Sequence, residues 1–196
     1  MSRTGITSIG VLTGAAIYTA IFFYISNITV QNTPALVIET AVPYVLKERA
    51  AQPVRLKIPS MQVNALVEHV GLTSDNAMDV PKNRANVAWF EPGWRPGENG
   101  NAIMAGHYGI RNRKPSVFDN LHKLRKGDKV YVEDEKGVTI SFVVSKIRRY
   151  DSNADASSVF TSSDGKAHLN LITCEGVWDK TAESYSKRLV VFAELE

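Results

Sequence analysis

Alternating apolar and polar positions recur through the chain from residue 53 onward and predict β-strands. Val54–Ile58 alternates apolar and charged residues, and Pro59 ends the pattern. Side chains on a strand point to opposite faces with a period of two, so such alternation is typical of a sheet with one buried face. The segments expected to form strands are 54–58, 63–70, 101–105, 129–132, 138–147, 168–173 and 188–195.

Two further patterns indicate how these strands are connected. Glu133–Gly137 lies between two strand patterns and predicts the turn of a β-hairpin. Val117–Leu124 has apolar residues at helical spacing and predicts the one substantial helix of this region, with Ser116 as its cap. Seven to eight short strands with one or two short helices predict a mainly β protein, either a closed antiparallel barrel or a sandwich.

The N-terminal region carries a long run without charge, Ile6–Ile25. A helix of about 20 residues spans the hydrocarbon core of a bilayer, so the run predicts a membrane anchor. Arg3 precedes it and favours a cytoplasmic N-terminus. The alternative is a cleaved signal peptide, but its apolar core is usually about 7–15 residues long. In addition, Ser26–Thr29 is not a clean cleavage signal.

The chain is therefore expected to have four parts. They are a cytoplasmic tail (1–5), a transmembrane anchor (6–25), a linker interrupted by prolines (26–52) and one β domain outside the membrane (53–196). A domain of this size is large enough to bury a single core.

The net charge of +3 raises the question of nucleic-acid binding. However, the basic residues are spread among 20 acidic ones, and no stripe of aromatic and basic residues is present. Nucleic acid is therefore not an expected partner.

Cys174 is the only cysteine, so it cannot form an intramolecular disulfide. An unpaired thiol in an exported protein is a candidate for reactivity. Cys174 follows the apolar run 168–173 and precedes Glu175 and Gly176, which predicts a position where a strand ends in a loop. The alternative is a small buried apolar residue, as many free cysteines are.

His107 follows the strand expected at 101–105 and has a glycine two residues beyond it, which makes it a candidate for proton transfer. A structural histidine is the alternative. The other three, His69, His122 and His168, lie within strand or helix patterns and are expected to be surface or packing residues. No pair has the spacing of zinc ligands beside a second thiol, so neither a metal site nor a cofactor is expected.

Arg188 is expected to open the last strand, after a loop from Glu175 to Lys187. The return of the chain would bring Arg188 close to Cys174. A guanidinium beside a thiol can stabilise an oxyanion through its fixed fork of donors. The alternative is an ordinary charge at a strand edge, which is the interpretation given to Lys187.

Three motifs at these positions resemble the sortase family, the membrane-anchored cysteine transpeptidases of bacterial surfaces. Leu171–Cys174 resembles the Thr-Leu-x-Thr-Cys motif, Ala105–His107 resembles the strand-end Gly-His, and Lys187–Ala193 resembles the arginine-led last strand. One departure is Asn170, which stands where the family usually has its first threonine. Segments 56–59, 96–102 and 124–128 also resemble sortases, so the resemblance extends over about residues 54–195.

The resemblance implies a closed antiparallel barrel and a peptide-transfer reaction. Cys174 would attack the Thr–Gly bond of a Leu-Pro-x-Thr-Gly-type sorting signal, and an amine of the cell wall would release the thioacyl enzyme. His107 would transfer protons, Arg188 would hold the substrate carbonyl and Thr173 would help to bind the substrate threonine. The implied partners are surface proteins with a C-terminal sorting signal, a cell-wall precursor and the cytoplasmic membrane.

Within the family, the chain most resembles class F or a neighbouring class. No Asp-Pro-aromatic lid precedes the domain and no second span follows Glu196, which counts against a sortase that polymerises pilins.

Three other classes of protein are alternatives. In L,D-transpeptidases, histidine lies much closer to cysteine and arginine follows the cysteine almost directly, whereas Glu175 follows here. Papain-like peptidases have cysteine before histidine, the reverse of this chain. A catalytically inactive, anchored β-barrel that binds surface ligands is the third alternative.

Overall fold

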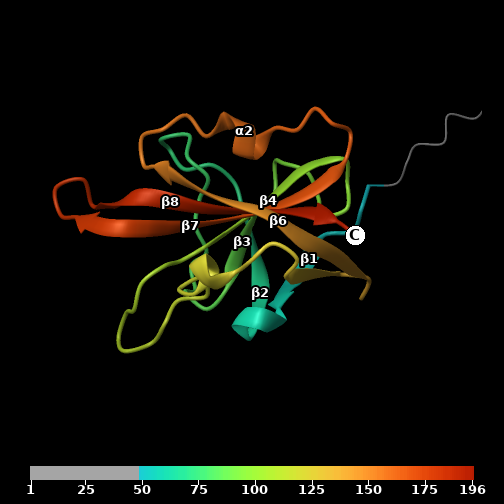
Figure 1. The fold of residues 1–196 in the computed structure, drawn as a ribbon, viewed down its shortest axis with the longest axis horizontal. Coiled ribbons are helices and arrows are strands. Elements are labelled where there is room, and N and C mark those ends of the chain that lie inside the picture. The colour runs from blue at the N-terminus through green and yellow to red at the C-terminus, as the bar shows by residue number, and fades with distance from the viewer. Residues whose placement is uncertain (1–48) are drawn as a thin grey trace, which may run out of the picture. The chain divides into compact units, whose positions relative to one another are not determined.

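The computed structural model describes residues 49–196 (Figure 1). The expected tail, the anchor at 6–25 and most of the linker lie outside the described residues. Within 49–196, no helix has the length and apolar character needed to cross a bilayer.

Within residues 49–196, eight strands close into a barrel in the order β1-β2-β3-β4-β7-β8-β6-β5. The mainly β, closed-barrel prediction is confirmed. Neighbouring strands are antiparallel except for β2–β3 and β4–β7, which are parallel. The strands are β1 (Pro53–Ile58), β2 (Val63–Val70), β3 (Val87–Phe90), β4 (Gly100–Gly106), β5 (Lys129–Asp134), β6 (Thr139–Asp151), β7 (Ala167–Asp179) and β8 (Ser184–Leu195).

The helical elements of residues 49–196 are short: the 3₁₀ turns η1 (Pro59–Met61) and η2 (Leu121–Lys123), and the helix α2 (Ser157–Phe160). The predicted helix at 117–124 was wrong, because only η2 and preceding turns form there. Its apolar residues instead close one end of the barrel, where Phe118, Leu121 and Leu124 join the main core. Ser116 caps no helix, since its hydroxyl donates to the carbonyl of Gly109.

The barrel has a core inside and a second, smaller core on its outer face. The inner core includes Leu169 and Leu171 of β7, whereas Ile172 faces the other way. The outer core consists of Ile103, Val159 and Val190, packed against Met78, Phe90, Tyr150, Ala156, Ile172 and Phe192. α2 lies over this outer face, beside β4 (Figure 1). The strands here are apolar on both faces, so a cleft can form outside the barrel.

Candidate active site

The parallel pairing of β4 and β7 directs the residue after β4, His107, toward the position of Cys174. The paired residues differ by 67 positions, from Gly100 opposite Ala167 to Ala105 opposite Ile172. Continuing this register by two residues places His107 opposite Cys174 (174 − 107 = 67). A hydrogen bond supports the alignment one residue earlier, because the hydroxyl of Thr173 donates to the carbonyl of Gly106 at 2.7 Å.

The antiparallel strands on the other side of β7 extend this row. Arg188 of β8 pairs directly with Cys174 and also with Tyr150 of β6. Directly opposed residues of neighbouring strands point to the same face of a sheet. Cys174, Arg188 and Tyr150 therefore form one row across β7, β8 and β6, and His107, the residue after β4, continues the β4 register toward that row. Tyr150 had no signal in the sequence and was missed.

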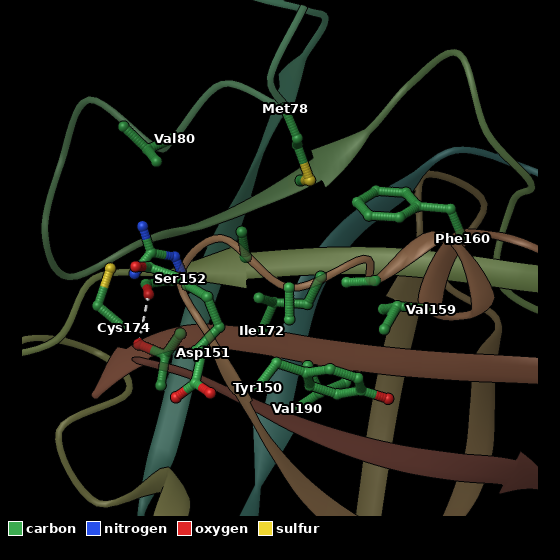
Figure 2. Close-up of a pocket in the computed structure, with 16 residues that line it drawn as sticks. Met78, Val80, Tyr150, Asp151, Ser152, Val159, Phe160, Ile172, Cys174 and Val190 are labelled. Carbon is green, nitrogen blue, oxygen red and sulfur yellow. Dashed lines mark hydrogen bonds between the residues drawn. The ribbon is translucent and has the colours of Figure 1, made fainter. Parts of the chain in front are cut away.

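This row borders a cleft on the outer face of the barrel. The next row along β7 and β8 pairs Ile172 with Val190, and both belong to the outer core. The cleft has a volume of about 230 Å³. Figure 2 shows Cys174 at one end, Phe160 of α2 towards the other, and Met78 and Val80 above. The lining is mostly apolar: Met78, Val80, Ala105, Gly106, Tyr150, Asp151, Ser152, Ala154, Ala156, Val159, Phe160, Ile172, Thr173, Cys174, Arg188 and Val190.

Cys174 does not lie where its strand ends, and this part of the prediction was wrong. β7 continues to Asp179 and β8 begins at Ser184, so the expected loop is a long hairpin. Trp178 and Tyr185 pair across it with their rings 5.1 Å apart, edge to face. Arg188 is accordingly inside β8 rather than at its start. The sulfur itself is half-buried and free.

Arg188 lies along the backbone of this hairpin. Its Nη1 donates to the carbonyls of Tyr185 at 2.9 Å and Lys187 at 3.0 Å, and its Nη2 donates to the hydroxyl of Ser184 at 3.0 Å. The neighbouring Lys187 instead forms an exposed ion pair with Asp151 at 3.0 Å. The two adjacent cations therefore have different surroundings, and Arg188 is the one opposite the thiol.

His107 is held from outside the row. Its Nε2 lies 2.8 Å from the carbonyl of Pro81, within the β2–β3 connection. A carbonyl can only accept, so Nε2 carries the hydrogen and a neutral ring has its lone pair on Nδ1. His107 is half-buried but is not part of the cleft lining. The nitrogen available for proton transfer is therefore Nδ1.

The family model for the sortase domain matches residues 56–196. The chain belongs to the sortase family. Two curated relatives are sortase A of Streptococcus agalactiae, 29% identical over 101 residues, and sortase A of Listeria monocytogenes, 28% identical over 141 residues. These alignments cover 51% and 72% of this chain, but only 37% and 55% of the respective relatives.

Solved sortase structures share the fold. A lid mutant of sortase A from Corynebacterium diphtheriae superposes with a TM-score of 0.59 at 22% identity, covering 76% of this chain and 72% of that one. For sortase A of Listeria monocytogenes the TM-score is 0.54 at 25% identity, with 75% and 88% covered. Class F is not among the classes named by these relatives, so the subclass stays a prediction.

In this sortase fold, Thr173 connects the strands that carry Cys174 and His107. It lines the cleft but is only 3% exposed, and its hydroxyl is engaged with Gly106. Thr173→Val keeps the shape and removes that hydrogen bond, leaving the buried Gly106 carbonyl short of a donor. We expect the free energy of unfolding to fall by about 1–3 kcal/mol, measured by urea denaturation. The same change at exposed Thr181 is the control, and an equal loss there would contradict this role.

Asn170, the departure from the family motif, supports the far wall of the cleft. Its side-chain nitrogen donates to the carbonyl of Val159 at 2.6 Å, and Asn101 donates to the same carbonyl at 3.0 Å. Both amides are buried. The two hydrogen bonds connect α2 to β4 and β7. Asn170 therefore supports the shape of the cleft and makes no contact with Cys174 through them.

Two of the other histidines, His69 and His168, contact residues outside the row. His69 packs edge to face on Trp89 at 5.1 Å, and His168 lies 2.9 Å from a carboxylate oxygen of Asp164. Hydrogen bonds from the Lys166 backbone, from His168 and from Ser162 lower the pKa of Asp164 well below its usual range. Residues 49–196 contain no group of three or more His, Cys, Asp or Glu side chains arranged to hold a metal ion.

Proposed function

We propose that this chain is a transpeptidase that cleaves a Leu-Pro-x-Thr-Gly-type sorting signal between threonine and glycine and joins the threonine to a cell-wall amine. The observation that carries the proposal is the direct pairing of Cys174 with Arg188 at the end of an apolar cleft, with His107 one residue beyond β4 in the register that leads to Cys174. Family membership supports the reaction type. Because the chain spans only part of its curated relatives, its own substrates and partners belong to this proposal.

The proposed reaction has two acyl-transfer steps. The Cys174 thiolate attacks the threonine carbonyl, and the Thr–Gly C–N bond breaks as His107 protonates the departing amine. The acyl group is then held as a thioester. In the second step the incoming amine gives a proton to His107 and attacks the thioester carbonyl, which regenerates the thiolate and forms a new amide.

Arg188 is proposed to bind the oxygen of the threonine carbonyl as negative charge develops on it. Its present acceptors are two backbone carbonyls and the Ser184 hydroxyl, all on the hairpin. Substrate would replace some of these acceptors. The guanidinium would move along the hairpin rather than across the cleft, because Arg188 already lies directly opposite Cys174 in the sheet.

The cleft is proposed to hold the residues that precede the scissile bond. Its walls away from Cys174 are apolar, including Val159, Phe160 and Val190 (Figure 2). A leucine–proline pair presents apolar surface and few donors, so such walls favour it over a charged segment.

The location of the protein also belongs to the proposal. The uncharged run at 6–25 would anchor it in the cell membrane, with the catalytic domain on the outer side and surface proteins and wall precursors as partners. We expect the protein to fractionate with membranes, and a chain beginning at Gln52 to be soluble and active. A mature protein recovered from the medium that starts after Tyr24 would instead indicate a cleaved signal peptide.

Mass spectrometry of the full-length protein with a library of sorting peptides and an added amine tests the proposed function. The expected product is a peptide cut after threonine and extended by the amine. An inactive surface-binding barrel would give no product with any peptide. Its cysteine would also be alkylated slowly unless the protein were unfolded.

A further inference from the structure

A basic hollow lies beside the His107 segment and shares no residue with the catalytic cleft. Its volume is about 570 Å³, and its walls come from the β2–β3 connection and from the turn after His107. The lining consists of Lys82, Asn83, Arg84, Ala85, Arg111, Asn112, Lys114 and Pro115. Four of these residues are cations and none is acidic. None of the four cations forms an ion pair with another residue of 49–196.

Two of the cations are held directly opposite each other. The backbones of Arg111 and Lys114 exchange hydrogen bonds of 3.0 Å in both directions across a two-residue turn. Like charges in directly opposed positions destabilise a hairpin. The turn itself is unusual, because Asn112 and Arg113 both have left-handed backbones, with φ of 52° and 61°, where the second position is commonly glycine. A bound anion would offset the repulsion between the two cations.

Arg84 forms a fixed part of the opposite wall. Its Nη2 donates to the carbonyls of Tyr108 at 2.7 Å and Gly109 at 3.0 Å, and to the hydroxyl of Ser116 at 2.6 Å. Its Nε is buried and has no acceptor within residues 49–196. The guanidinium is thus held in place with part of its donor capacity unused.

Glu68 interacts with the charge of Lys82 but does not line the hollow and leaves the other three cations uncompensated. Glu68 accepts hydrogen bonds from the backbone nitrogens of Lys82 and Asn83 and from the side chain of Asn86. These hydrogen bonds occupy the Glu68 carboxylate, which does not line the hollow.

We propose that this hollow binds a phosphate-bearing anion with two or more charges, for which inorganic pyrophosphate is the simplest probe. Two guanidinium groups and two ammonium groups match the several oxygens and the charge of such a ligand, and arginine forks bind phosphate oxygens in pairs. A single carboxylate would balance only one of the four charges. The proposal rests on the hollow alone and does not depend on the peptide-transfer reaction.

Both walls of the hollow also hold His107. Lys82 directly follows Pro81, whose carbonyl accepts from His107 Nε2, and Arg84 holds the carbonyl of Tyr108, the residue after His107. An anion that joins the two walls would therefore fix the segments on either side of this histidine. Through these contacts, anion binding at the hollow would make the position of His107 in the proposed active site more rigid.

The test is calorimetric titration of the full-length protein with pyrophosphate at constant ionic strength. The wild type should bind at one site, and pyrophosphate should raise its thermal midpoint. The double variant Arg111→Gln/Lys114→Gln should bind at least ten-fold more weakly. Without ligand it should unfold at the same or a higher temperature, because the opposed charges are gone. The control Arg148→Gln/Lys166→Gln removes the same number and kinds of exposed charges elsewhere and should bind like the wild type.

Vesicles of neutral lipid with and without phosphatidic acid, whose phosphomonoester headgroup can carry two charges, distinguish the source of the phosphate. If vesicle binding needs Arg111 and Lys114 and pyrophosphate competes with it, the hollow takes the phosphate of a lipid headgroup. If pyrophosphate binds but vesicles do not, the ligand is soluble. Equal weakening in both double variants would show general charge attraction, and no saturable pyrophosphate binding would show that no site exists. Either of these last two results would overturn the proposal.

Discussion

Replacing Cys174 with alanine should abolish peptide cleavage and leave the barrel folded. The thiol is half-buried, lies on the outer face and belongs to neither core, so its loss creates no cavity among the packed residues. The expected kcat/KM is that of the uncatalysed background, because no other cysteine can form the thioester. A fluorogenic sorting peptide measures the activity, and thermal unfolding measured alongside it should show an unchanged midpoint.

Cys174→Ser is the matched control for this variant. Serine retains the size and polarity of the side chain, but its hydroxyl is a much weaker nucleophile than a thiolate. Both variants should therefore be inactive and fold like the wild type. Cleavage retained by Cys174→Ala would rule out the nucleophile assigned above.

The second large effect is expected at Arg188. If its guanidinium stabilises the oxyanion, Arg188→Ala should cost about 3–4 kcal/mol of transition-state stabilisation, or 10²–10³ in kcat/KM. Arg188→Lys keeps the charge but loses the fork of donors, so it should recover only part of the activity. The three hydrogen bonds to the hairpin are also lost in the alanine variant. Its unfolding midpoint must therefore be recorded alongside its activity.

Lys187 provides the internal control for Arg188. It is the adjacent cation, its side chain points to the other face of β8, and its ion pair with Asp151 is exposed. Exposed pairs contribute about 0–1 kcal/mol, so Lys187→Ala should change kcat/KM little. Equal losses at 187 and 188 would indicate a general effect of positive charge, and the specific role of Arg188 would be wrong.

The strands were easiest to predict where one face is buried and the other is polar. β1 and the β5–β6 hairpin follow that alternation, and the sequence placed them within a few residues. β3 was missed because Val87–Phe90 is apolar throughout. Trp89 fills the inner core while Phe90 packs outward on Phe160, so no alternation marks this strand.

The hairpin beyond Cys174 was missed for a local reason. In the sequence, Gly176 suggests a turn. In the structure its φ is 91°, and it lies where the register of the β7–β8 pairing shifts, while the two strands continue beyond it. A Cβ at this position would clash with the hydroxyl of Ser186 on the opposite strand, and the left-handed backbone of Gly176 also favours glycine. Glycine inside a strand and glycine in a loop have the same sequence signature.

In the candidate site, some residues can be identified from local motifs, whereas others are brought together only by long-range packing. His107, Cys174 and Arg188 could be named because each lies in a short motif, and the strand registers then align them. The walls of the cleft could not be named. Met78 and Val80 come from the β2–β3 connection, while Val159 and Phe160 come from α2, and only tertiary packing brings these segments together.

Mapping of the acyl group on the protein tests the central claim most directly. Full-length protein is mixed with a sorting peptide without any amine, quenched in acid, digested and analysed by mass spectrometry. The account predicts that the peptide containing Cys174 gains the mass of the substrate segment ending in threonine, and that adding the amine before the quench removes this mass. Peptide cleavage with no adduct at Cys174, or with an adduct on another residue, would contradict it.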